Sequence, residues 1–254
     1  MNINQKRGGI IVHRLGMNGQ VLQQRLADIQ RAIVDDKNQM IAANPNWDAK
    51  KDVRITSLNN LAVIVARTRL GIVFLSELLD DNWWEAHLSE PLPEDDKISH
   101  TVSFEQIIKY NFGMSFFTGI EAGFRALLRA LDPNACRSAT AAFKSIYDCL
   151  LGSNQLAFSA TDKQGATELL DFIRLIRNLI HNSGIYFSED SCDKEQTYKG
   201  TKYKFCHGKP VDFATWDLLL TLARDIHQLL VRVIKHQKIV AVAEITDPFS
   251  AHNW

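Results

Sequence analysis

The sequence has no excess of charge of either sign. Lysine and arginine together number 29, as do aspartate and glutamate, so the formal net charge is +0. A protein without net charge exerts no general attraction on nucleic acid or on an anionic membrane surface. A nucleic acid would therefore have to bind a local cluster of basic residues.

Cysteine is scarce, with 4 residues in a chain of 254 and no C-x-x-C pair. A chain of this length buries a sizeable core without disulfides, so the pattern indicates a reducing cytoplasm. Cys192, Cys206 and His207 lie close together in the sequence, but their spacing matches no standard zinc pattern and no fourth ligand is evident. We therefore predict no metal site and no cofactor.

The sequence also lacks a long uninterrupted hydrophobic run. The most apolar segment, residues 59–79, contains Arg67 and Arg69 and falls short of the roughly 20 apolar residues that a membrane span needs. The first residues carry only a short apolar run before His13, too short for a signal peptide. We expect a cytoplasmic protein with no membrane association and interpret the apolar segment as a buried helix.

Apolar residues recur at spacings of three and four along most of the chain, which indicates an all-α fold. Ser103, followed by Glu105, is typical of a helix N-cap, and the sequence Asn182-Ser183-Gly184 is typical of a helix end. The predicted helices span residues 18–43, 57–81, 103–131, 138–152, 163–182 and 211–238.

Two segments depart from the helical pattern. From Thr197 onward, aromatic residues are interleaved with lysines and flanked by glycines, which predicts a small β-hairpin before the last long helix. Residues 82–102 carry two prolines and an acidic run, which is typical of a linker or of a loop over the surface. The sequence therefore predicts a boundary near residue 100, between an N-terminal helical region, 1–100, and a helical bundle, 101–254.

The predicted fifth helix carries an unusual polar stripe near its end. Within LLDFIRLIRNLIHNSGIYF, residues 169–187, Arg174, Arg177 and His181 are spaced i, i+3 and i+7 and so share one helix face. The aliphatic residues of the segment fall mostly on other faces, which would pack into a core.

The segment IRNLIHNSGIY resembles the signature helix of HEPN domains, in which an arginine, often followed by a polar residue, precedes a histidine by a few positions. Arg177 has Asn178 beside it and three residues before His181, whereas Arg174 is followed by Leu175 and lies farther away, so either arginine can be the counterpart. The resemblance covers about the last 150 residues and implies a HEPN-like four-helix bundle, preceded by additional helices.

Many members of the family are metal-independent endoribonucleases, so the resemblance implies cleavage of RNA by attack of the ribose 2′-hydroxyl. His181 would transfer protons, Arg177 or Arg174 would stabilise charge on the phosphate, and Asn178 would orient them. The family's two-fold dimer would bring two such helices to one cleft, so we expect a homodimer. The expected setting is a toxin or antiviral defence, with an antitoxin or a nucleotidyltransferase as partner.

RNA would also contact the hairpin, where Lys202 and Lys204 supply charge and Tyr203 an aromatic face, and Asn182 at the helix end. Lysines on an edge strand that discourage aggregation explain the hairpin equally well. Glu121 and Arg125, spaced i, i+4, predict an ion pair.

Two alternatives to catalysis remain. The stripe of Arg174, Arg177 and His181 would also suit a helix C-terminus, where basic groups meet the last carbonyls and Asn182 ends the helix. A second alternative is a non-catalytic helical module that uses the stripe to bind a nucleotide, a nucleic acid or a protein.

Overall fold

The computed structural model describes residues 19–134, 141–152 and 155–246, and most of these residues are helical. This confirms the all-α class with one small two-stranded sheet. The elements, in chain order, are α2 (Gly19–Ala43), α3 (Val53–Glu77), α4 (Asp81–His87), α5 (Glu94–Leu131), α6 (Phe143–Leu150), α7 (Ala160–His181), β1 (Lys194–Tyr198), β2 (Thr201–Phe205), α8 (Trp216–Ile234) and α9 (Gln237–Val240).

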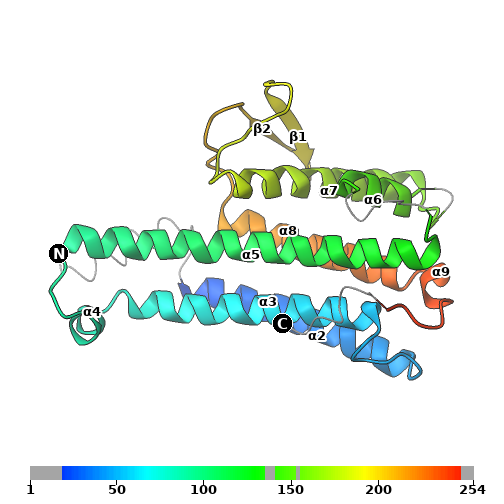
Figure 1. The fold of residues 1–254 in the computed structure, drawn as a ribbon, viewed down its shortest axis with the longest axis horizontal. Helices are drawn as coiled ribbons and strands as arrows, with labels where there is room; N and C mark the ends of the chain where they lie inside the picture. The colour runs from blue at the N-terminus through cyan, green and yellow to red at the C-terminus, as the bar shows by residue number, and fades with distance from the viewer. Residues whose placement is uncertain (1–18, 135–140, 153–154, 247–254) are drawn as a thin grey trace.

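The long helices form three layers (Figure 1). Helices α6 and α7 form the upper layer, α5 and α8 the middle one, and α2 and α3 the lower one. Helix α5 contacts α3 on one side and α6 and α7 on the other, and α8 bridges α2 and α7. Helix α5 is therefore the common support of the two outer layers.

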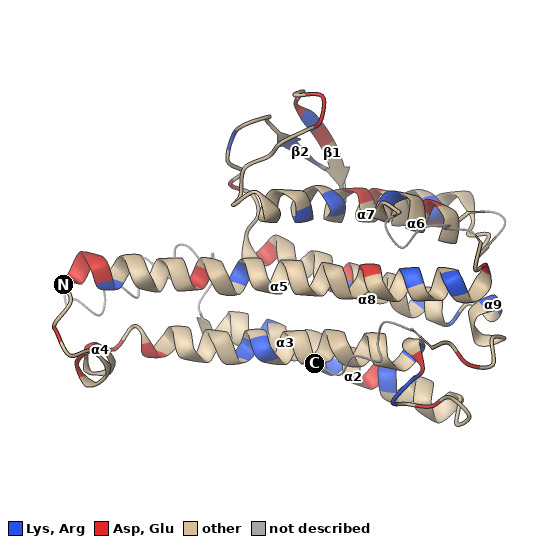
Figure 2. Cartoon of the chain, in the orientation of Figure 1, with Lys and Arg blue, Asp and Glu red and all other residues tan. Residues whose placement is uncertain are grey.

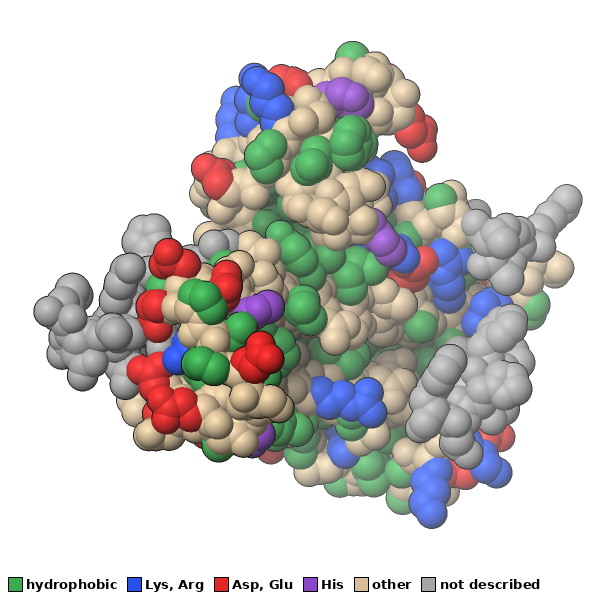
Figure 3. Space-filling view, turned by 60° about the vertical axis from the view of Figure 1, so that its left-hand side comes forward, with side chains coloured by type: hydrophobic (Ala, Val, Ile, Leu, Met, Phe, Trp, Pro, Cys, Tyr) green, Lys and Arg blue, Asp and Glu red, His purple; other side chains and the backbone are tan. Residues whose placement is uncertain are grey.

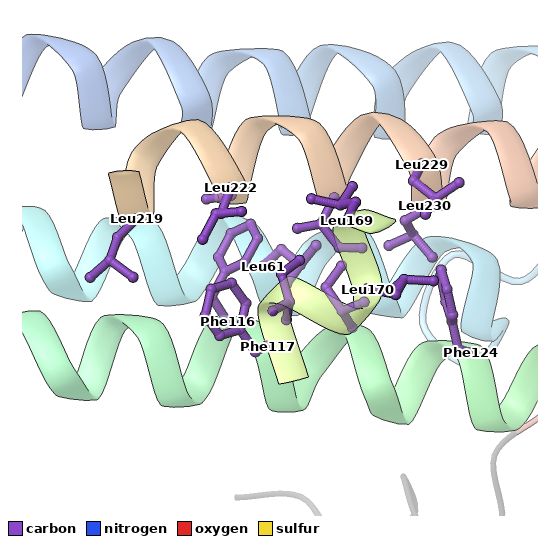
Figure 4. Close-up of a cluster of buried hydrophobic side chains, with 14 of the residues drawn as sticks. Leu61, Phe116, Phe117, Phe124, Leu169, Leu170, Leu219, Leu222, Leu229 and Leu230 are labelled. Carbon is purple, nitrogen blue, oxygen red and sulfur yellow. The ribbon is translucent and has the colours of Figure 1, made fainter. Parts of the chain in front are cut away.

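The layers share one hydrophobic core, shown in Figure 4. Phe116 and Phe124 of α5 meet Leu61 of α3, Leu170 of α7 and Leu222 of α8, and each of these side chains is at most 1% exposed. Burying one such side chain contributes about 1.5–3 kcal/mol, so the contact between layers is a main source of stability.

The segment predicted as a linker is mostly helical, and that prediction is wrong. Helix α4 occupies residues 81–87, and α5 begins at Glu94, well before the N-cap predicted at Ser103. Pro93 precedes α5 with φ −56°, and three acidic residues follow in its first turn, where they complement the positive end of the helix dipole. Position 100 therefore lies inside α5, and α3 packs along that helix.

The hairpin prediction is confirmed, with β1 and β2 antiparallel and Tyr198 paired with Thr201. The two turn residues, Lys199 and Gly200, have φ of 50° and 76°, as a type I′ turn requires. Tyr198 donates a hydrogen bond to Asp225 of α8, and Lys199 forms an ion pair with the same carboxylate at 2.6 Å. These contacts tie the tip of the hairpin to the bundle.

Several helix ends differ from those predicted. Helix α3 begins at Val53, four residues before the predicted start, because the side chain of Asp52 accepts a hydrogen bond from the backbone N–H of Arg54 and caps it. Thr215 caps α8 in the same way, so residues 211–215 precede the helix. Helix α6 is shorter than predicted, and residues 138–140 lie outside the described residues.

A buried arginine joins the start of α3 to the last described residues. Arg54 and Asp52 are both 0% exposed and form a two-point ion pair, with Nη2 2.5 Å from Oδ2. Nη1 of Arg54 donates to the carbonyls of Ile239 and Val242 at 2.9 and 2.8 Å, and Nη2 donates to that of Ala243 at 3.3 Å. The end of α9 and the residues that follow it thereby satisfy the buried charge.

Candidate functional site: a polar stripe on α7

Helix α7 carries the predicted stripe on its partly exposed side. Ser159 caps the start of the helix by accepting from the N–H of Asp162. At the end, Ser183 and Gly184 adopt φ of 54° and 87°, and the N–H of Gly184 donates to the carbonyl of Leu179, which confirms the predicted cap. His181 is the last helical residue and is exposed.

A glycine on α5 brings the C-terminal half of α7 close to that helix. A Cβ on Gly113 would lie 2.8 Å from Cδ1 of Ile180, so the two helices touch where residue 113 has no side chain. This contact fixes the depth at which α7 packs. Three positions before Ile180, Arg177 reaches an acidic side chain of α5.

Arg177 binds a carboxylate of α5. Nη1 of Arg177 donates to Oε2 of Glu121, while Oε1 of Glu121 accepts from Nε of Arg125 at 3.0 Å and from its Nη2 at 2.5 Å. Arg125 also donates to the carbonyl of Ala141 at 2.6 Å. One carboxylate thus lies between two guanidinium groups, and we call Glu121, Arg125 and Arg177 the α5–α7 charge cluster. The side chain of Arg177 remains 28% exposed.

Arg174 belongs to a second polar group, between α7 and α6. Its Nη2 lies 3.8 Å from Oδ1 of Asp171, and the hydroxyl of Tyr147 donates to the same oxygen at 2.5 Å. Burial raises the pKa of Tyr147, and the nearby Asp171 raises it further, so the hydroxyl keeps its proton. The long Arg174–Asp171 separation leaves Arg174 more loosely held than Arg177.

Both arginines keep an unsatisfied donor. Nε of Arg174 and Nε of Arg177 are buried and have no hydrogen-bond partner within the described parts of the chain. A buried donor without an acceptor costs about 1–3 kcal/mol. The stripe is therefore not fully satisfied by its own protein neighbours.

The asparagines of the stripe differ in their roles. Asn178 is exposed. The side chain of Asn182 donates to the carbonyl of Asn178 at 2.9 Å, so it satisfies the end of the helix. The structure thus exposes Asn178 to solvent, and it assigns Asn182 a capping contact.

The hairpin residues predicted to bind RNA do not share one surface. Tyr203 is half-buried, with its ring 4.6 Å from that of Phe172 in α7 and 5.0 Å from that of Phe213. Lys202 and Lys204 alternate with Tyr203 along β2 and are exposed on the other face, because successive strand residues point to opposite sides. Figure 3 shows basic side chains gathered at the hairpin, at the top of the molecule. Lys204 lies 3.3 Å from Asp193.

Sequence reasoning missed the acidic partners of the stripe. Glu121 and Arg125 form the predicted pair, but Glu121 also binds Arg177, 56 positions away. Tyr147 and Asp171 were not singled out, although an aromatic hydroxyl on one amphipathic helix and a carboxylate on the next are a recognisable signal. Among the described residues, no group of three or more histidine, cysteine or acidic side chains is arranged to hold a metal ion.

Comparison of the chain with models of protein families, with curated proteins and with solved structures finds no match. The function of the chain is therefore inferred from the geometry of the stripe alone. That geometry combines an exposed imidazole with a guanidinium one helical turn earlier, about 6 Å along the axis. A histidine and an arginine on neighbouring turns of one helix face supply a proton-transfer group and a fixed positive charge, which suit a phosphodiester.

Proposed function

We propose that this protein is a metal-independent endoribonuclease that uses a HEPN-like Arg/His site. The proposal is carried by one observation: His181 and Arg177 lie one turn apart on the accessible side of α7, and Glu121 holds Arg177 in place. An arginine already oriented by the protein loses little side-chain freedom when it binds a phosphate.

The reaction needs one proton removed and one supplied. The 2′-oxygen of a ribose attacks the adjacent phosphorus, the bond from phosphorus to the 5′-oxygen breaks, and the products are a 2′,3′-cyclic phosphate and a 5′-hydroxyl. His181 would take the proton from the 2′-hydroxyl, and Arg177 would stabilise the negative charge on the phosphoryl oxygens. Asn178, which is exposed and follows Arg177 in the chain, would contact the ribose or the phosphate.

One chain supplies one such histidine, whereas the leaving oxygen also needs a proton. We propose that this proton comes from His181 of a second copy, in a homodimer. In a toxin or defence setting, an antitoxin or a nucleotidyltransferase would control the site by covering α7.

The test is cleavage of a panel of RNAs by purified protein in EDTA, with the 2′,3′-cyclic end identified by mass spectrometry. His181→Ala is expected to lower the cleavage rate by about 10²–10⁴-fold. The matched control is His100→Ala, which removes another exposed histidine, on α5, and should cleave normally. If the wild-type protein leaves every RNA intact with any inhibitor removed, the nuclease proposal fails.

A second function, binding without cleavage, is favoured by the α5–α7 charge cluster. Glu121 already occupies donors of Arg177 and Arg125 that the phosphoryl group would need at the transition state. A binding module predicts salt-dependent association with RNA or a nucleotide, no products, and loss of the signal in Arg174→Ala. Retention of binding in that variant would contradict a role for the stripe.

A further inference from the structure

The outer side of α3 is apolar and uncovered. By length and composition α3 could cross a membrane, yet it packs between α2 and α5, and 39% of the residues in its most apolar stretch are buried. Leu70, Val73 and Phe74 are 56%, 50% and 54% exposed. Isolated exposed hydrophobic residues are common, but a contiguous group on one helix face marks an interaction site.

The exposed residues form a stripe with charges at both ends. Arg67, Leu70, Phe74 and Glu77 are spaced by three, four and three positions, so they lie within one narrow sector of α3. Neither charged side chain has an ion-pair partner within residues 19–134, 141–152 and 155–246. Figure 2 shows that α3 carries few charged residues between these ends. We call these four residues the α3 stripe.

A shallow groove of about 260 Å³ runs beside the stripe, between α3 and α5. Its floor is at Gly71, where a Cβ would lie 3.2 Å from Cγ1 of Ile108. Ile107 of α5 borders the groove and is 61% exposed. The groove gives an aromatic or aliphatic side chain from outside a place to enter.

We propose that the α3 stripe is a homodimer interface, in which the α3 helices of two copies cross antiparallel about a two-fold axis at the level of Ile72. The sequence is self-complementary about that position. Leu70 and Phe74 lie two positions on either side of it, and Arg67 and Glu77 lie five positions on either side. In an isologous contact residue i meets j while j meets i, so each Leu70 meets a Phe74 and each Arg67 a Glu77.

The charges select a second copy over other occupants. A lipid surface would gain from the apolar centre but would leave both Arg67 and Glu77 without opposite charges. Two antiparallel copies pair both residues at the rim, where ion pairs fix register and orientation. The partner's Phe74 would also be close to the groove at Gly71.

This interface is independent of the proposed ribonuclease site. Figure 1 places α7 in the upper layer and α3 in the lower layer, with α5 and α8 between them. The α3 contact therefore leaves the α7 stripe open. If cleavage also requires two copies of His181 to meet, each chain would make two separate contacts, and the assembly would be larger than a dimer.

The test is the mass of the full chain in solution, by light scattering and analytical ultracentrifugation over a concentration series. Wild-type protein is expected at a multiple of its 28.8 kDa mass. Phe74→Glu is expected to halve the observed mass, because this change raises the dissociation constant of the α3 contact at least about 100-fold. The matched control, Phe187→Glu, alters a phenylalanine that is 50% exposed after α7, and it should leave the α3 contact intact.

Charge reversal tests the register. Arg67→Glu should weaken the contact about tenfold at low salt, and adding Glu77→Arg to the same chain should restore it. Circular dichroism checks that each variant is folded.

A monomeric wild-type protein overturns the proposal. If that monomer binds vesicles of phosphatidylcholine and phosphatidylserine, the face is a membrane surface instead. If it dimerises only when residues 1–18 are removed, the chain's own N-terminal segment covers the face. The interface is also contradicted if Phe74→Glu leaves the oligomer unchanged. It is contradicted as well if Arg67→Glu weakens the oligomer and the added Glu77→Arg does not restore it.

Discussion

Two arginine–carboxylate clusters in this protein have similar chemistry and different surroundings. Arg54 is 0% exposed and donates to two oxygens of Asp52 and to three backbone carbonyls, and its Cζ lies 3.6 Å from the centre of the Trp47 ring. Arg177 is 28% exposed, shares its carboxylate with Arg125, and has a buried Nε without a partner. The first cluster is saturated by the protein, whereas the second is partly exposed and leaves one of its donors unsatisfied.

The largest effect is expected from breaking the saturated cluster. Arg54→Ala leaves Asp52 buried without its counter-charge and removes the donors of three carbonyls. We expect the free energy of unfolding to fall by about 3–5 kcal/mol, measured by urea denaturation. The control, Arg31→Ala, removes an arginine that is 66% exposed beside Asp28 and should change little. Equal effects of the two changes would show that burial does not decide the outcome.

Substitution in the α5–α7 charge cluster is expected to have a smaller effect on stability. Its effect on RNA binding is diagnostic. Glu121→Gln leaves Arg125 and Arg177 without their shared negative charge, and we expect stability to fall by about 1–2 kcal/mol. The same change should tighten RNA binding and steepen its salt dependence, since phosphates no longer compete with the carboxylate. Filter binding at several salt concentrations measures both. Weaker binding would mean that Glu121 serves mainly to orient Arg177.

The pH dependence of stability tests the effect of burial at a third, titratable residue. His227 of α8 is 2% exposed, and burial lowers its pKa, although Asp36, 3.3 Å away, opposes the shift. The unfolded chain, with a histidine pKa of about 6.5, then binds more protons than the folded one. Stability should therefore be full above that pH and decline as the pH falls toward the lowered folded pKa.

Thermal denaturation of wild type and His227→Gln over this pH range measures the contribution of His227. In His227→Gln, stability should decline less as the pH falls than it does in wild type. In His100→Gln, which changes an exposed histidine, stability should decline as in wild type. An unchanged profile in His227→Gln would mean that other groups cause the decline.

The smallest effect is expected at the surface. Arg232 and Asp162 lie 3.0 Å apart and are 52% and 53% exposed, so water screens their attraction. Arg232→Ala should change the free energy of unfolding by no more than about 0.5 kcal/mol in urea denaturation. A loss comparable to that in Arg54→Ala would contradict the ranking by exposure.

Local signals in the sequence predicted much of the fold. The helix periodicity, the end of α7 at Asn182-Ser183-Gly184 and the hairpin with its turn at Gly200 all depend on neighbouring residues, and the structure confirms them. The start of α5 was missed, because a proline followed by acidic residues is typical of a loop and of a helix N-terminus alike.

Contacts between distant residues were harder to predict. Glu121 and Arg177 are 56 positions apart, and Arg54 meets carbonyls more than 180 positions away, so no local spacing indicates either contact. The orientation of Tyr203 could have been predicted more easily from the sequence. It shares a hairpin face with Tyr198 and Phe205, and three aromatic residues on one face of a hairpin are typical of packing against a core.

The contacts of Arg54 also affect the order in which the helices can fold while the chain is being translated. Its guanidinium lies at the start of α3, yet three of its acceptors belong to residues 239–243. Until the ribosome has released those residues, a stably docked α3 would hold a buried cation with incomplete solvation. The N-terminal helices therefore cannot reach their final packing before residues 239–243 have left the ribosome, and a nascent chain stalled before residue 239 should stay open to chaperones and proteases.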